Sequence, residues 1–265
     1  MSGIFLASAM TALAQKPDAA EQSRALAALR DYALNYTKSL PDFICTQVIE
    51  RAFGINGRGG HDSIEEQVTY VGARENYTIT KINGQPVSKG HDQVAGIVSS
   101  GEFGSLLASV FNPQAEADVH WERALNRNGR RVYVFAYRVP EKKGYGLVES
   151  TGTVRAAYKG LIYADAETGA VVHIEMECEI PKDSEFRELE IALDYKPTEV
   201  GEREFLLPSH YRLHALREAI PAERNNRTRA ERRLREETNE TDYKGYRKFE
   251  ANSSVTFGGD AGPGR

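Results

Sequence analysis

Long stretches of the chain alternate between apolar and polar residues with a period of two. The alternation is clearest after the turn at residues 165–169. One set of positions there is apolar: Val172, Ile174, Met176, Cys178 and Ile180. The positions between them hold a histidine and three glutamates. Such a pattern predicts a β-strand with one buried face and one face in water.

Turn signals divide most of the chain into about ten or eleven predicted strands. Asn-Gly pairs at 56–57, 83–84 and 128–129 separate strand-like runs, and this dipeptide suits tight hairpin turns. The predicted strands lie at 43–53, 64–70, 77–81, 119–121, 132–139, 153–158, 160–180 (a hairpin), 189–195, 205–216 and 246–257. Because the links are short, consecutive strands should be neighbours in one curved antiparallel sheet.

Two helices are expected beside the strands. Residues 18–38 begin with Asp18 and Glu21, the spacing of a capping box, and end before Pro41. A second, short helix should follow the similar signal Ser99–Glu102. The predicted fold is therefore mainly β (α+β), an open half-barrel formed by a single sheet, with an N-terminal helix and a short inserted helix.

The N-terminal residues 1–14 resemble a signal peptide. They form an apolar run that ends in Ala12-Leu13-Ala14, and the run is shorter than the roughly 20 residues that span a bilayer. No lysine or arginine precedes Lys16, so an ordinary apolar tail is the alternative. We expect a periplasmic or secreted protein with a single domain over 15–257 and a disordered tail over 258–265.

The segment 219–242 is dense in arginine and glutamate and has no apolar stripe. This pattern predicts a charged insertion, either a long loop or a solvated helix. Its arginines could touch anionic lipid head groups, as a peripheral membrane contact, or a partner. Because glutamates nearly balance the arginines, we favour a solvated loop.

Composition and motifs exclude several function classes. The 265-residue chain has a net charge of -4, which gives no pull toward nucleic acid. The sequence has no His-Glu-x-x-His, no Gly-x-Ser-x-Gly and no glycine-rich phosphate loop. We therefore expect a protein that is not an enzyme and that has no cofactor and no metal site.

Several segments resemble the lipoprotein-carrier superfamily of bacterial envelopes, which includes LolA, LolB and the N-terminal domain of RseB. They are Tyr163–Ile174, with an aromatic, an Asp, a turn and a strand, and the hairpin formed by Leu189–Tyr195 and Phe205–Pro208. The start Leu40–Cys45 is also similar to that of secreted bacterial proteins. Ala166, where proline is common, and the insertion 219–242 depart from the family pattern. The resemblance implies an open half-barrel whose concave face can hold acyl chains.

The strand pattern supplies candidate ligand-binding residues that should share one face. They are Tyr133, Phe135, Tyr137, Ile174, Met176, Leu193, Tyr195, Tyr211 and Leu213. One interpretation is an ordinary core beneath the helices. The other is a groove for a lipid or another apolar small molecule, because two helices cannot cover so wide a sheet. A further alternative is an RseB-like interaction module whose face binds an envelope protein.

Cys45 and Cys178 are both expected to point inward. In an oxidising compartment they are a candidate disulfide. Two buried free thiols are the alternative, because strands so far apart in the chain need not be neighbours.

Overall fold

The structure, a computed structural model, describes residues 17–55, 58–89, 94, 96–97, 101–127, 129–218 and 233–249. The signal-like segment 1–14, the tail 258–265 and the Asn56-Gly57 turn lie outside these residues. None of the described helices is long and apolar enough to cross a membrane.

The described elements are two helices, two 3-10 turns and the strands of a sheet. In chain order they are α1 (Ala19–Ser39), β1 (Phe43–Ile55), β2 (Arg58–Val71), β3 (Arg74–Ile82), β4 (Gln85–Lys89), α2 (Ser105–Phe111), η2 (Pro113–Ala115), β5 (Asp118–Arg127), β6 (Arg130–Val139), η3 (Glu141–Lys143), β7 (Tyr145–Glu149), β8 (Gly152–Asp165), β9 (Val171–Glu179), β10 (Phe186–Val200), β11 (Arg203–Glu218) and β12 (Leu234–Lys248).

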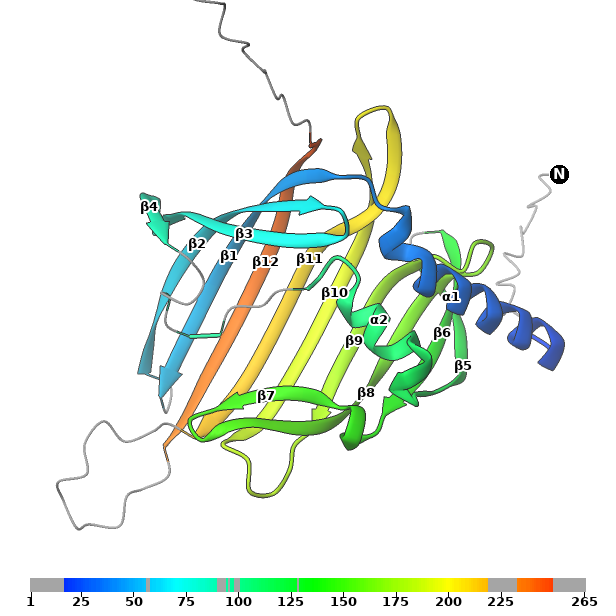
Figure 1. The fold of residues 1–265 in the computed structure, drawn as a ribbon. Coiled ribbons are helices and arrows are strands. Elements are labelled where there is room, and N and C mark those ends of the chain that lie inside the picture. The colour runs from blue at the N-terminus through cyan, green and yellow to red at the C-terminus, as the bar shows by residue number, and fades with distance from the viewer. Residues whose placement is uncertain are drawn as a thin grey trace, which may run out of the picture.

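The strands form one open, 12-stranded antiparallel sheet, which confirms the predicted fold class (Figure 1). The order is β4-β3-β2-β1-β12-β11-β10-β9-β8-β6-β5, and β7 pairs with β8 beside this path. The sheet curves around α1 and α2, which lie on its inner face (Figure 1). At the β3–β4 turn Asn83 and Gly84 have φ angles of 49° and 73°, as the Asn-Gly signal predicts.

The prediction for the C-terminal part of the chain was wrong. Residues 234–242, placed in a charged insertion, belong to β12, which pairs with β1 on one side and β11 on the other. The strand predicted at 246–257 ends at Lys248, and residues 219–232 and 250–257 lie outside the described part of the chain. Hydrophobic alternation missed β12 because its inward positions include Glu237, Asn239 and Thr241.

Both predicted helices are present, and the second begins later than its sequence signal. Asp18 caps α1 as predicted, since its carboxylate accepts a hydrogen bond of 2.7 Å from the backbone N–H of Glu21. The second helix begins at Ser105 and not directly after the signal at Ser99–Glu102. Gly104 precedes it with a φ of 127°. This conformation is not helical and favours glycine, so the helix cannot extend back through this residue.

One glycine shapes the inner face of the sheet. Gly160 on β8 lies opposite Tyr137 on β6, and the phenol reaches across it to donate a 2.8 Å hydrogen bond to the carbonyl of Glu175 on β9. Between β8 and β9 the ladder is interrupted there, with no pairs at Gly160 and Leu161 along this fully described stretch. The absent side chain thus lets one tyrosine link three strands.

We predict that Gly160→Ala destabilises the protein, although alanine usually suits a strand better than glycine. A Cβ atom at this position would lie 1.9 Å from the Glu175 carbonyl oxygen and 2.9 Å from Cε1 of Tyr137. The expected loss in the free energy of unfolding is about 1–3 kcal/mol, measured by chemical denaturation. Gly146→Ala is the matched control, because its Cβ would meet only the Thr153 methyl group at 3.3 Å. Equal stability of the two variants would contradict the prediction.

Candidate functional site

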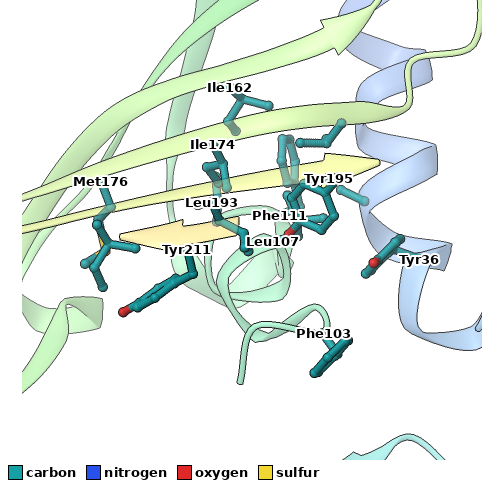
Figure 2. Close-up of a cluster of buried hydrophobic side chains, with 14 of the residues drawn as sticks. Tyr36, Phe103, Leu107, Phe111, Ile162, Ile174, Met176, Leu193, Tyr195 and Tyr211 are labelled. Atoms are coloured by element: carbon teal, nitrogen blue, oxygen red, sulfur yellow. The ribbon is translucent and has the colours of Figure 1, made fainter. Parts of the chain in front are cut away.

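All nine predicted ligand-binding residues lie on the inner face in one apolar cluster. Each of them exposes 5% of its surface or less. Figure 2 shows Ile174, Leu193 and Tyr195 gathered between the strands and Leu107 and Phe111 of α2. The structure therefore brings the nine together, and their role in binding a ligand stays a prediction.

Aromatic contacts hold much of this apolar cluster. Trp121 packs edge-on against Tyr133 and Phe135, with ring centroids 4.9 and 5.7 Å apart. Tyr36 of α1 packs edge-on against Tyr195 at 5.8 Å. The hydroxyl of Tyr133 bonds to the carboxylate of Glu21 on α1. These contacts make the part of the face beneath α1 a packed core.

A cavity remains beneath α2, where the cover is thinner. Its volume is about 180 Å³, and Leu193 and Tyr211 of the predicted set line it. The other lining residues come from β7, β10, α2 and the turn before α2: Gly101, Glu102, Ser105, Leu106, Ser109, Tyr145 and Ile191. We call this space the α2 cavity. Its wall is mostly apolar, and the lining includes the buried Glu102.

The inner face changes character at β12, β1 and β2. Gln47, Thr241 and Tyr243 are buried there, and we call these three side chains the inner polar patch. Direct pairing places Gln47 opposite Tyr243 on β12 and opposite Glu66 on β2. The sequence analysis missed this patch. The signal for Gln47 was a polar residue between Cys45 and Ile49 at an inward position.

Further along β12, charged and amide side chains hold the connection between β4 and α2. The carboxylate of Glu237 accepts a 3.0 Å hydrogen bond from the backbone N–H of Ile97, and Asn239 donates one of 2.8 Å to the Ile97 carbonyl. Glu237 also forms ion pairs with Arg217 at 2.8 Å and Arg235 at 2.6 Å. The chain is thus fixed across this end of the inner face.

A second, larger cavity is an open groove on the outer face, with a volume of about 730 Å³. Charged residues of neighbouring strands line it. Two of them, Arg138 and Arg212, form ion pairs of 2.6 Å with Glu179 and Glu240 beside the groove. Its small lining residues are Ala136, Gly160 and Ala192. The lining thus combines charged side chains with apolar residues such as Leu161.

His173 borders this groove and bonds two carboxylates. Its Nδ1 lies 2.8 Å from Asp194 and its Nε2 lies 3.1 Å from Glu175. Partial burial acts to raise the pKa of Asp194, but the His173 hydrogen bond and the charges of His173 and Arg127 outweigh it and lower this pKa. Within the described residues there is no group of three or more side chains that could hold a metal ion.

Cys45 and Cys178 both point inward, as predicted, and both are free thiols. The strands β12, β11 and β10 stand between β1 and β9, a separation of about 19 Å along the sheet. A disulfide needs Cα atoms closer than about 7 Å. Of the two alternatives, the structure has the unbridged one.

We predict that the cysteines react slowly in the folded protein. Burial raises the pKa of both thiols to about 12, so the reactive thiolate is scarce near neutral pH. Thiol labelling followed by mass spectrometry should give almost no label on native protein. It should give two labels on protein denatured without reductant. Labels that appear only after reduction would establish a disulfide.

We predict that Phe135→Ala costs about 3–5 kcal/mol of stability, because this ring is fully buried against Trp121. Chemical denaturation measures the loss. Val148→Ala, at a side chain that is 72% exposed, should change stability by less than about 0.5 kcal/mol. A small effect of Phe135→Ala together with weaker ligand binding would instead mark this stripe as a groove.

Comparison with known proteins gives structural neighbours and no close relative. No family model matches the chain, and no curated protein matches it. Among solved structures it is similar to a LolA superfamily protein from Nitrosomonas europaea, at 11% identity and a TM-score of 0.40, covering 85% of this chain and 94% of that one. It is similar to a DUF1329 family protein from Desulfovibrio piger, at 11% identity and a TM-score of 0.42, covering 86% and 94%. A third neighbour, a putative outer membrane lipoprotein-sorting protein domain from Vibrio parahaemolyticus, has 9% identity and a TM-score of 0.40, covering 83% and 90%. The superfamily named from the sequence is thus among the remote structural neighbours of this chain.

Proposed function

We propose that this protein is an extracytoplasmic, non-enzymatic binding protein that holds an acyl chain or another apolar group on the inner face of its sheet. The observation that carries the proposal is the α2 cavity. It leaves an empty space of about 180 Å³ beside the buried side chains of Ile191, Leu193 and Tyr211.

The size of the α2 cavity limits what enters it. At about 180 Å³ it is smaller than the roughly 300 Å³ at which pockets for whole small ligands begin. The cavity therefore suits the end of an alkyl chain, and a longer chain needs more of the inner face. Each buried methylene group contributes about 0.8 kcal/mol, so a chain end already supplies useful affinity.

The α2 helix is the element that would move to admit more of a chain. It has only 7 residues, and Gly104, which precedes its first residue, gives it no side-chain cap. Helices this short are marginal by themselves. Tyr158 fixes its middle by donating to Ser109, at 3.1 Å to the carbonyl and 2.9 Å to the hydroxyl. A shift of α2 would uncover the predicted residues beside the cavity, Leu193 and Tyr211 first.

Binding of an envelope protein is the second candidate function. The outer-face groove favours it, since its volume is about 730 Å³ and its lining mixes charged side chains with apolar ones, as protein interfaces do. Replacement of His173 or Arg212 in the groove would lower the affinity for such a partner and leave the α2 cavity intact.

Native mass spectrometry of protein purified from its own envelope tests the first function. A co-purifying lipid and binding of the uncharged apolar dye N-phenyl-1-naphthylamine are the expected results. A mass equal to that of the ligand-free chain, together with no dye binding, would contradict the carrier function.

We predict that Leu106→Trp weakens dye binding at least about tenfold, because the larger side chain on α2 fills the α2 cavity. Fluorescence titration measures the affinity, and thermal denaturation checks the fold. Leu34→Trp is the matched control, since this leucine lies on α1, is 44% exposed and does not line the cavity. Equal affinities of the two variants would show that the dye binds elsewhere.

A further inference from the structure

The inner polar patch contains buried hydrogen-bonding groups without partners. Gln47 and Thr241 are fully buried and Tyr243 is 7% exposed. Neither amide atom of Gln47 has a hydrogen-bond partner among the described residues, nor does the hydroxyl of Thr241 or of Tyr243. Leaving such a group buried and unsatisfied costs about 1–3 kcal/mol. Buried polar groups normally have a protein, water or ligand partner, so we expect a bound molecule to supply partners for these three side chains.

The three side chains are close enough to act on one small group. Gln47 and Tyr243 are direct cross-strand neighbours, whose Cβ atoms lie about 5 Å apart. Thr241 lies two residues from Tyr243 on the same face of β12, about 7 Å away. Together they offer an amide donor, an amide acceptor and two hydroxyl groups.

The patch lies beside the α2 cavity. Tyr211, which lines the cavity on β11, is the direct cross-strand partner of Thr241 on β12. Phe103, two residues before α2, packs edge-on against Tyr243 with ring centroids 5.6 Å apart. The short segment from Phe103 through α2 therefore covers both the inner polar patch and the α2 cavity. A shift of α2 would connect the two.

We propose that the inner polar patch binds the uncharged, hydroxyl- or amide-bearing head group of an amphiphile whose alkyl chain occupies the α2 cavity. This inference rests on the proposed function and names the ligand class for the same inner face. The hydroxyls of Thr241 and Tyr243 and the amide of Gln47 pair with hydroxyl or amide groups of the head.

The surroundings of the patch disfavour an anionic head. Gln47 lies directly opposite the fully buried Glu66. Burial, and next the charge of Glu102, raise the pKa of Tyr243 well above its ordinary value, so its hydroxyl stays a neutral donor and a negative charge is near. A phosphate or carboxylate here would lose its hydration, and no cationic side chain is part of the patch to offset that cost. The binding groups themselves are all uncharged, which matches a neutral head better than an ammonium group.

A set of amphiphiles with one chain length tests the head-group preference. The probes are a monoacylglycerol, the fatty acid with the same chain, the corresponding alkylammonium, and the headless dye N-phenyl-1-naphthylamine. Isothermal titration of the full chain should give the tightest binding for the monoacylglycerol. Tighter binding of the fatty acid or of the alkylammonium would overturn the inference.

Gln47→Leu tests the residue assignment. It should lower the affinity for the monoacylglycerol at least about tenfold and leave the dye affinity unchanged. The melting temperature of the ligand-free variant should stay the same or rise, because unsatisfied polar atoms are removed from a buried position. Gln67→Leu is the matched control, since Gln67 lies on the exposed face of β2. Thr241→Val, nearly equal in shape, gives the same test if Gln47→Leu folds poorly.

The outcomes separate this inference from the proposed function. Monoacylglycerol and dye binding that neither Gln47→Leu nor Thr241→Val changes would show that buried water alone occupies the patch. That result overturns the head-group site and leaves the carrier function standing. Failure of every probe, the dye included, to bind the wild-type protein overturns both.

Discussion

The ladder between β1 and β12 makes this a single sheet. It runs from Phe43 paired with Lys248 to Ile55 paired with Arg235, with one shift in register near Ile44. On either side of this ladder lie two runs of strands, β4 to β1 and β12 to β5, in which every neighbour along the sheet is also close in sequence. Among the described strands, only the β1–β12 pair joins strands from opposite ends of the chain, so its loss would leave two separate meanders, each with a newly exposed edge.

The same ladder explains what the sequence could predict and what it could not. On β9 and β10 the apolar residues alternate with mostly polar ones, because one face packs under helices and the other meets water. The apolar positions are Ile174, Met176, Leu189, Ile191 and Leu193. Those strands and their turns follow from local pattern alone. On β12 the inward positions hold Glu237, Asn239 and Thr241, so alternation carried no hydrophobic signal. A central strand with a polar buried face looks like a loop in the sequence.

The candidate site divides along the same line. The apolar residues could be assigned to one face by parity within each strand, and the structure places all nine in one cluster. The inner polar patch depends on the register of β12 against β1, a contact between residues almost 200 positions apart. Sequence pattern has no information about such a pairing, so Gln47 and Thr241 could not be brought together in advance. The separation of Cys45 from Cys178 likewise follows from the strand order and not from either local sequence.

The chemistry of the inner face follows from what covers it. Helices satisfy their own backbone hydrogen bonds, so the strands beneath α1 and α2 can be apolar. An irregular chain segment brings unsatisfied N–H and C=O groups, and the strands beneath it must supply partners. Glu237 and Asn239 do this for the N–H and the carbonyl of Ile97. The inner polar patch lies between the strands under the helices and the strands under the Ile97 segment. Within the described part of the chain, neither the helices nor that segment donates or accepts a hydrogen bond with the side chains of Gln47 or Thr241. If these positions served folding alone, leucine and valine would give a more stable protein, because they bury no unsatisfied hydrogen-bonding group. The position of these polar residues next to a cavity is the reason for proposing a ligand there.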